Sequence, residues 1–499
     1  MKKYSFSSVL LMGLVFLSTS CDLTLDPYNG KSADVLLNSA SGLQTATYGN
    51  YSFLKDFEYT RSIHFLTEYP SDNVMLSGTT TDHLTYAYNY RHIESMTHTS
   101  NFWKKAYQLI YGANKVIETI DSDVNGLART ATDQLKGENL YLRAMVHFNL
   151  VNLFGRPYSQ NNGASPGVMI RKDTDVTALP ARSTVKEVYD FIEADLLQAA
   201  DLMTEAKNSS FASKEVCYAL LSRVYLYKQD NAKAIEYANK VISSNRYKMV
   251  DTETYKKYFT IANETNTETI FAVKHTSLDD RGQSSIGSLY YSKNGAGYGE
   301  IYASEAYRNL LDKFPADVRH SFYEPVYVLD AKGNMTYDAA GKPILANRNG
   351  YPKYYINKYS NQEGLITLSS PVYLRLAEIY LNRAEAYAKT GKDQAALDDV
   401  NLIRTRAGLT GSALYAPGAL KGKASVLDVV LEERRIELAF EGQRKYDLFR
   451  NNLPLFRDYP GTHLLNGQTT QTVPASDPRV VYFIPQLEIV LNPNLVQNP

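Results

Sequence analysis

One stretch of the sequence, residues 371–408, has the pattern of two antiparallel helices joined by a tight turn at Thr390-Gly391-Lys392. Small residues are needed where such helices face each other, because bulky side chains would hold the two backbones apart. Small, aromatic and apolar residues fall at the spacing this packing needs, at Ala384, Tyr387, Ala396, Val400 and Ile403. The same spacings recur earlier, at Ser222, Tyr225, Ala234, Ala238 and Val241, with Tyr218 matching Tyr380. The repeat predicts a scaffold of stacked helical hairpins.

These hairpins resemble tetratricopeptide (TPR) units, and a third, interrupted unit is predicted nearer the N-terminus. Arg143-Ala144, within a predicted helix over 129–154, resembles Arg383-Ala384 of the central hairpin. That helix stops at Gly155 before Pro157, and its partner helix is expected only after a loop, over 183–203. We therefore expect a mostly α fold: a TPR-like helical-hairpin scaffold with long, irregular, loop-rich insertions and minor β structure.

The N-terminus has the pattern of a lipoprotein signal peptide. Lys2 and Lys3 precede a short apolar run over 9–17, and small residues lead up to Cys21. The run is too short to cross a bilayer, which needs about 20 apolar residues. We expect residues 1–20 to be removed and Cys21 to carry the lipid, which makes the membrane a partner through this N-terminal anchor.

Charge and cysteine content exclude several classes of protein. The formal net charge is +0, and removing the leader takes away two lysines, so there is no basic field for nucleic acid. Once Cys21 is acylated, Cys217 is the one cysteine left in the sequence and no intramolecular disulfide can form. Cys217 falls on the apolar side of a repeat helix and is expected to be a small core residue.

Composition divides the mature chain into two regions, 21–250 and 251–499. The first carries TPR-like helices, including one over 101–120 whose Trp103 lies on an apolar stripe and is expected in the core. The second begins with a loop-rich segment, 251–370, continues with helices over 371–450 and ends with a tail over 451–499. Long irregular segments inside a compact protein are usually functional, so 251–370 is predicted to carry ligand contacts.

A long helix is predicted over 425–449, with apolar residues on two opposite sides. Such a helix must be sandwiched between neighbours. Arg434 falls within one apolar stripe, bordered by Glu437 and Glu441 at helical spacing. An unpaired buried arginine would cost several kcal/mol, so we expect a buried ion network here rather than a catalytic site.

Several motifs occur together in a fixed order along the mature chain. They are WKKAYQLIYGANKVIE (103–118), LRAMVHFNLVNLFGRPY (142–158), Asp317-x-Arg319, LEERRIELAFEGQRKYDLFR (431–450) and FIPQLEIVLNPNLVQNP (483–499). With the lipoprotein leader and the TPR-like hairpins, they resemble the SusD/RagB family of nutrient-binding lipoproteins of Bacteroidota.

The resemblance implies a lipid-anchored protein on the outer face of the outer membrane that captures a nutrient, most often a glycan. It implies a partner, a SusC-like TonB-dependent transporter, on which the protein sits as a hinged lid. It also implies no enzymatic activity and no cofactor. The motifs identify the scaffold and the anchor but not the ligand site, because the ligand residues of the family vary with the substrate.

The ligand site is therefore predicted from chemistry. A sugar offers an apolar C–H face, on which an aromatic ring stacks, and hydroxyls that polar side chains bind. Two tyrosine-rich loop clusters carry both kinds of group, and the contacts of the family tend to come from these regions. The first cluster supplies Asp82, Tyr86, Tyr88, Asn89, Tyr90 and Arg91. The second supplies Tyr290, Tyr291, Asn294, Tyr298 and Tyr302.

Other interpretations stay open at this point. The period-two spacing of Tyr86, Tyr88 and Tyr90 also suits one face of an edge strand packed on the body. The ligand could be a peptide, or the chain could be a TPR scaffold with no ligand. A glycosidase built on Asp72, Asp82, Glu94 and Glu300 has no support without measured separations. No metal site is predicted from the histidine spacing, although a structural calcium ion is left open.

Overall fold

The computed structural model describes residues 36–77, 84–122, 128–465 and 467–499. The predicted leader, Cys21 and Asp82 lie outside these ranges. The helices are α2 (Ala40–Phe53), α3 (Phe57–Glu68), α4 (Leu84–Asn89), α5 (Thr97–Asp121), α6 (Arg129–Phe154), α7 (Val185–Leu202), α8 (Lys214–Lys228), α9 (Asn231–Ser243), α10 (Thr252–Tyr255), α11 (Gly287–Tyr290), α12 (Glu305–Leu311), α13 (Leu376–Lys389), α14 (Asp393–Arg406), α15 (Val426–Glu437), α16 (Arg444–Arg450) and α17 (Gln486–Leu491).

Short strands and 3₁₀ turns make up the rest of the regular secondary structure in the described part of the chain, and the strands form antiparallel pairs. The strands are β1 (Val74–Leu76), β2 (Thr269–Ala272), β3 (Ile301–Ala303), β4 (Tyr323–Pro325), β5 (Asn347–Arg348), β6 (Tyr351–Pro352), β7 (Tyr354–Ile356), β8 (Val372–Arg375), β9 (Leu455–Arg457) and β10 (Gln471–Val473). The 3₁₀ turns are η2 (Asn161–Gly163), η3 (Tyr258–Thr260), η4 (Ser277–Asp279), η5 (Gly282–Ser284), η6 (Val318–Phe322), η7 (Gly411–Ala413) and η8 (Pro478–Val480). The mostly α prediction is confirmed.

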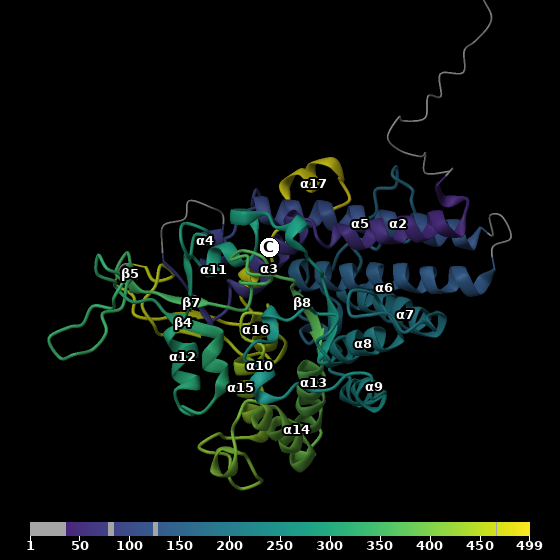
Figure 1. Ribbon diagram of the computed structural model, residues 1–499. Coiled ribbons are helices and arrows are strands. Elements are labelled where there is room, and N and C mark those ends of the chain that lie inside the picture. Colours follow the sequence, from purple (N-terminus) through teal and green to yellow (C-terminus); the bar gives the residue numbers. More distant parts are fainter. Residues whose placement is uncertain (1–35, 78–83, 123–127, 466) are drawn as a thin grey trace, which may run out of the picture.

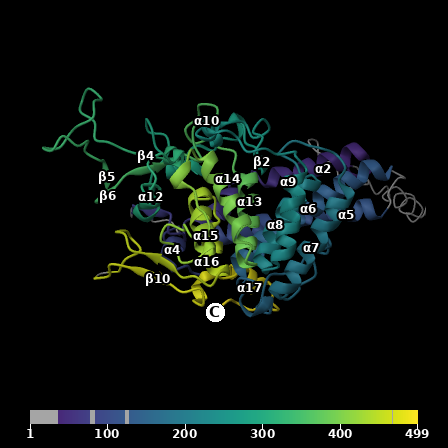
Figure 2. The same cartoon turned by 90° about the horizontal axis from the view of Figure 1, so that it is seen from below.

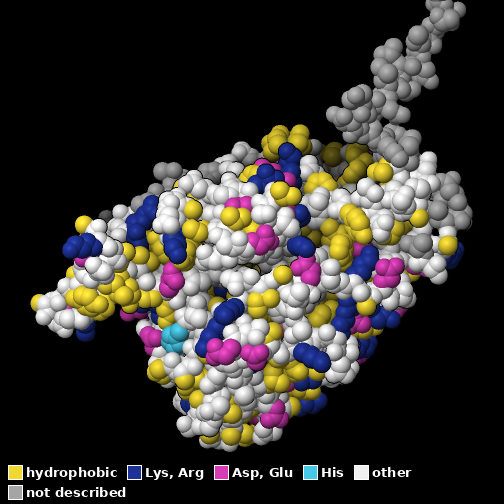
Figure 3. All heavy atoms as spheres, viewed as in Figure 1, with side chains coloured by type: hydrophobic (Ala, Val, Ile, Leu, Met, Phe, Trp, Pro, Cys, Tyr) yellow, Lys and Arg dark blue, Asp and Glu magenta, His cyan; other side chains and the backbone are white. Residues whose placement is uncertain are grey.

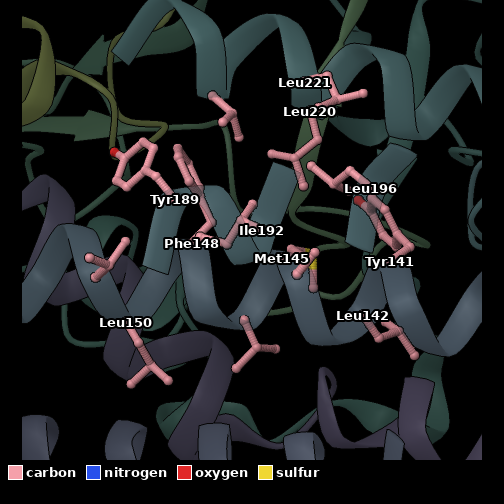
Figure 4. Close-up of a cluster of buried hydrophobic side chains, with 14 of the residues drawn as sticks. Tyr141, Leu142, Met145, Phe148, Leu150, Tyr189, Ile192, Leu196, Leu220 and Leu221 are labelled. Carbon is pink, nitrogen blue, oxygen red and sulfur yellow. The ribbon is translucent and has the colours of Figure 1, made fainter. Parts of the chain in front are cut away.

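The hairpins predicted from the repeat are α8–α9 and α13–α14, and α6–α7 is the interrupted third unit (Figure 1). Helix α13 packs against α9, so the units join into one curved array (Figure 2). Its apolar faces meet in a core to which α6, α7 and α8 contribute, with Met145, Ile192 and Leu221 among the buried side chains (Figure 4). Because the same core includes Leu374 and Tyr482, residues from both predicted regions share it.

An arginine–aspartate pair repeats between the units. Arg143 on α6 donates two hydrogen bonds to the Asp195 carboxylate on α7, at 2.8 and 2.7 Å. Arg383 on α13 donates in the same way to Asp399 on α14, at 2.9 and 2.7 Å. Each bidentate pair ties the two helices of its hairpin, which gives the Arg-Ala resemblance noted in the sequence a structural role.

Two predicted elements differ from the structure. The helix predicted over 425–449 is broken into α15 and α16, because Phe440 and Gly442 take left-handed backbone conformations with φ of 69° and 73°. The first tyrosine cluster, predicted to be a loop, instead includes the short helix α4. The edge-strand interpretation of Tyr86, Tyr88 and Tyr90 is wrong, because α4 covers 84–89.

The buried ion network predicted around α15 is present, but its pairs differ from those expected. Arg434 donates to the Asp447 carboxylate at 3.1 Å and to the Asn382 amide oxygen at 2.8 Å. Glu437 instead accepts from Arg375, at 2.5 Å, and from Arg319, at 3.2 Å.

Trp103 and Cys217 are buried in the core, as predicted. Among the described residues, no helix is long and apolar enough to cross a membrane.

Candidate functional site

The two tyrosine clusters predicted from the sequence meet in space. Strand β1, just before the first cluster, pairs with β3 of the second, with Met75 opposite Tyr302. Leu84 and Tyr88 of the first cluster share one apolar cluster with Tyr290 of the second. In Figure 1, α4 and α11 lie at the upper side of the molecule, away from the α13–α14 hairpin. Segments some two hundred residues apart thus form one surface.

Part of this set is buried and holds the surface together. Tyr290 is hydrogen-bonded to His64 Nε2 at 2.8 Å, and Tyr88 to His463 Nδ1 at 3.0 Å. Tyr90 donates to the Pro70 carbonyl at 2.5 Å. Burial lowers the pKa of His64 to about 3, so its ring is neutral at physiological pH. The rings of these tyrosines have no free face and support the surface from beneath.

Asn89, Tyr291 and Tyr302 are buried as well, although nearer the surface. Tyr291 and Tyr302 pack with Tyr355 in a second aromatic cluster. Burial raises the pKa of Tyr291 and of Tyr302 to about 12, so both phenols stay protonated. This cluster gives the surface a rigid aromatic base.

The remaining predicted residues are accessible. The side chains of Tyr298 and Tyr86 are 46% and 38% exposed. Arg91 follows α4 and Asn294 lies at the tip of a tight turn, both exposed. The Tyr298 hydroxyl donates to Gln283 Oε1 at 2.8 Å, which fixes the phenol end of the side chain. Tyr298 thus presents a large, anchored aromatic side chain to solvent.

A hairpin that sequence reasoning missed completes the surface. Strands β5 and β6 are joined by Asn349 and Gly350, both with positive φ, as a two-residue turn of this kind requires. Arg348 donates to the Glu300 carboxylate at 2.8 Å and to the Tyr298 carbonyl at 3.3 Å. In the sequence, an Asn-Gly pair between two short extended runs indicates a hairpin of this kind. Using that signal would have added Arg348 to the candidate residues.

Two of the acidic residues considered for a glycosidase, Asp72 and Glu300, are engaged in ion pairs with arginines. Asp72 is buried and accepts from Arg444 at 2.8 and 3.0 Å. Burial alone would raise the pKa of Asp72, but Arg435 and Arg444 hold it well below its ordinary value. Glu300 is paired with Arg348, and Asp82 lies outside the described residues. Across residues 36–77, 84–122, 128–465 and 467–499, no three His, Cys, Asp or Glu side chains converge as metal ligands.

Comparison with known proteins defines the family. Residues 221–499 match the family model described as "SusD family". The chain belongs to the SusD family. The preceding part, residues 25–226, matches a second model, described as "Starch-binding associating with outer membrane".

Individual members of the SusD family resemble the chain over most of its length. A SusD-like protein, P2, from Formosa agariphila is 26% identical over 100% of this chain and 99% of its own. The starch-binding protein SusD of Bacteroides thetaiotaomicron is 26% identical over 65% of each chain. A SusD superfamily structure from B. thetaiotaomicron superposes with a TM-score of 0.79, at 28% identity, covering 92% of this chain and 100% of its own. A putative sugar binding protein from Bacteroides vulgatus superposes with a TM-score of 0.76, at 28% identity, covering 92% of this chain and 98% of its own.

Proposed function

We propose that this protein binds a glycan at the surface formed by Tyr86, Tyr298 and the Arg348–Glu300 pair. The observation that carries the proposal is the exposed Tyr298 ring, whose hydroxyl is anchored by Gln283 and whose backbone carbonyl accepts from Arg348. An aromatic face beside charged and amide groups suits a sugar ring and its hydroxyls. Arg91 and Asn294 are exposed and remain proposed contacts, as does Asp82.

The buried residues of the two clusters have a different proposed role. Tyr88, Tyr90 and Tyr290 hold α4 and α11 in place through the hydrogen bonds described above. Tyr291 and Tyr302 form the aromatic base beneath the exposed groups. Asn89 fixes the end of α4, where its carbonyl accepts from Gln471 at 3.3 Å. Their substitution should alter the shape of the surface rather than remove a direct contact.

The protein works without catalysis, as a capture component on the outer membrane anchored through lipid on Cys21. Its partner is a SusC-like TonB-dependent transporter, over which it closes as a lid. A bound glycan favours the closed state only to the extent that it binds that state more tightly. The names of the related proteins and of the second family model, which refer to starch, sugar and the outer membrane, support this assignment.

Affinity electrophoresis of residues 22–499 tests the proposal. Native gels would contain amylopectin, pullulan, xylan, arabinan or inulin in turn. Retardation by one polysaccharide, lost in Tyr86→Ala/Tyr298→Ala, is expected. Tyr337→Ala is the matched control, because Tyr337 is 58% exposed on a different loop. Retardation that survives the double substitution would place the site elsewhere, and retardation by no polysaccharide, with binding of a peptide library instead, would overturn the glycan assignment.

A further inference from the structure

A groove of ≈ 580 Å³ lies between α5, the loop at 169–173 and the C-terminal helix α17. None of its lining residues belongs to the tyrosine surface described above. Figure 1 shows α17 beside α5, and Figure 3 shows apolar side chains gathered over α17 at the top of the molecule. The volume falls within the range of about 300–1,000 Å³ that is typical of small-molecule sites.

The floor and one wall of the groove are fixed by contacts within the protein. The Trp103 side chain is 1% exposed and its ring centre lies 5.0 Å from that of Tyr107. The Tyr107 hydroxyl donates to the Met169 carbonyl at 3.0 Å. Asn114 donates to the Asp173 carbonyl at 2.9 Å, which ties the loop wall to α5. The groove is therefore formed before any ligand arrives, which lowers the entropic cost of binding.

The rim carries polar groups with unused hydrogen-bonding capacity. Lys104, Gln108 and Tyr111 occupy one face of α5 at helical spacing, and Tyr111 is 45% exposed. None of the three side chains has a hydrogen-bond or ion-pair partner among the residues that the structure describes. On the opposite side, the partly buried Glu488 of α17 lines the groove together with Trp103.

The chemistry of the lining selects among classes of ligand. Lys104 and Arg171 balance Asp173 and Glu488, so the groove has no net charge to attract an anion or a cation. A purely apolar ligand would cover the partly buried Glu488 carboxylate without replacing its lost hydration, which is costly. A hydroxylated ring can hydrogen-bond to the polar side chains of both walls, because its hydroxyls accept from Lys104 and Gln108 and donate to Glu488. Its C–H face then stacks on Tyr111.

We propose that this groove is a second, independent binding site for a neutral oligosaccharide. The inference shares its ligand class with the proposed function and rests on it to that extent. It differs in position, because it uses α5 and α17 rather than the loops around Tyr298.

The chain provides a reporter specific to this groove. Trp103 is the single tryptophan of the sequence and lies in the groove floor. Ligand bound here alters the surroundings of its indole, so its emission should change, whereas ligand bound around Tyr298 leaves the groove unoccupied. We would titrate residues 22–499 with maltose, cellobiose, xylobiose and lactose up to about 20 mM, which saturates a site with a Kd of about 1 mM. The same titration would use any polysaccharide that retards the protein on native gels.

A saturable change in emission with at least one sugar is expected. In Tyr111→Ala/Gln108→Ala the Kd should rise about tenfold or more, whereas Tyr337→Ala should bind as the unsubstituted protein does. The Tyr86→Ala/Tyr298→Ala variant should keep the emission change while losing gel retardation, so the two sites can fail separately. Unchanged emission with every sugar, or a response unaffected by Tyr111→Ala/Gln108→Ala, would overturn the second site whatever the gels show.

Discussion

Arg348 and Glu300 form an ion pair at 2.8 Å that ties the β5–β6 hairpin to the segment leading into β3. The same guanidinium donates to the Tyr298 carbonyl, so one side chain positions both the hairpin and the exposed tyrosine. Arg348 is partly exposed, which allows it to contact ligand as well as protein. The pair therefore links two parts of the proposed glycan surface, the β5–β6 hairpin and the segment that carries Tyr298.

We expect Arg348→Ala to weaken glycan binding about tenfold while lowering the free energy of unfolding by about 1 kcal/mol, since a partly exposed ion pair contributes modestly to stability. Titration calorimetry with the polysaccharide identified on gels, and urea unfolding, would measure the two effects. Arg479→Ala, which breaks the ion pair between the exposed Arg479 and Asp477, is the control. It should change neither the affinity for the polysaccharide nor the free energy of unfolding by much. Equal affinity of Arg348→Ala and the unsubstituted protein would remove Arg348 from the site.

The ion network around Glu437 predicts a much larger effect on stability. This carboxylate accepts from Arg375, Arg406 and Arg319, all buried. Glu437→Gln leaves these guanidinium groups without their shared counter-charge, and we expect a loss of about 3–5 kcal/mol in the free energy of unfolding. Glu236→Gln, on an exposed pair with Lys240, should cost less than about 1 kcal/mol. Urea unfolding followed by circular dichroism measures both, and similar midpoints for the two variants would contradict the network.

Local signals in the sequence were sufficient for the helical array. The helix over 129–154 was predicted to the residue, because its apolar period is unbroken up to a glycine stop. The break between α15 and α16 could not be predicted, because residues 438–443 continue a helical pattern. What stabilises the break is distant: the Gly442 N–H donates to Glu68 Oε2 at 2.8 Å, on a segment near the other end of the chain.

The site was predictable only in part, for a related reason. Tyrosine serves both as a core residue and as a ligand platform, so composition could not separate Tyr290, which is buried, from Tyr298, which is exposed. That distinction depends on the β1–β3 pairing and on His64, which are contacts between distant segments. The Asn349-Gly350 turn was visible in the sequence, but its position beside Tyr298 was not.

Glu68 should make stability depend on pH. Burial raises the pKa of this carboxyl to about 8, against 4.5 ordinarily. Between these values the folded protein holds a proton that the unfolded chain has lost, so stability falls as pH rises through this window. The glutamine in Glu68→Gln cannot ionise. The free energy of unfolding of this variant should match that of the unsubstituted protein near pH 4.5 but exceed it by a few kcal/mol near pH 8. Unfolding by urea at several pH values measures the difference, and parallel curves for the two proteins would show that Glu68 is ionised in the fold.

Two glycines should respond to alanine in opposite directions. Gly442 has φ of 73°, and a Cβ there would lie 2.4 Å from Thr67 Oγ1. Gly442→Ala therefore adds both backbone strain and a steric clash at the break between α15 and α16, and should lower the free energy of unfolding by about 1–3 kcal/mol. Gly49 lies within α2, where an added Cβ meets nothing within 4 Å. Gly49→Ala should raise stability by about 0.5–1 kcal/mol, because alanine restricts the unfolded chain more than glycine does. Thermal unfolding of the two variants measures both changes in stability. A stabilised Gly442→Ala would mean that α15 and α16 can join into the continuous helix that the sequence pattern favours.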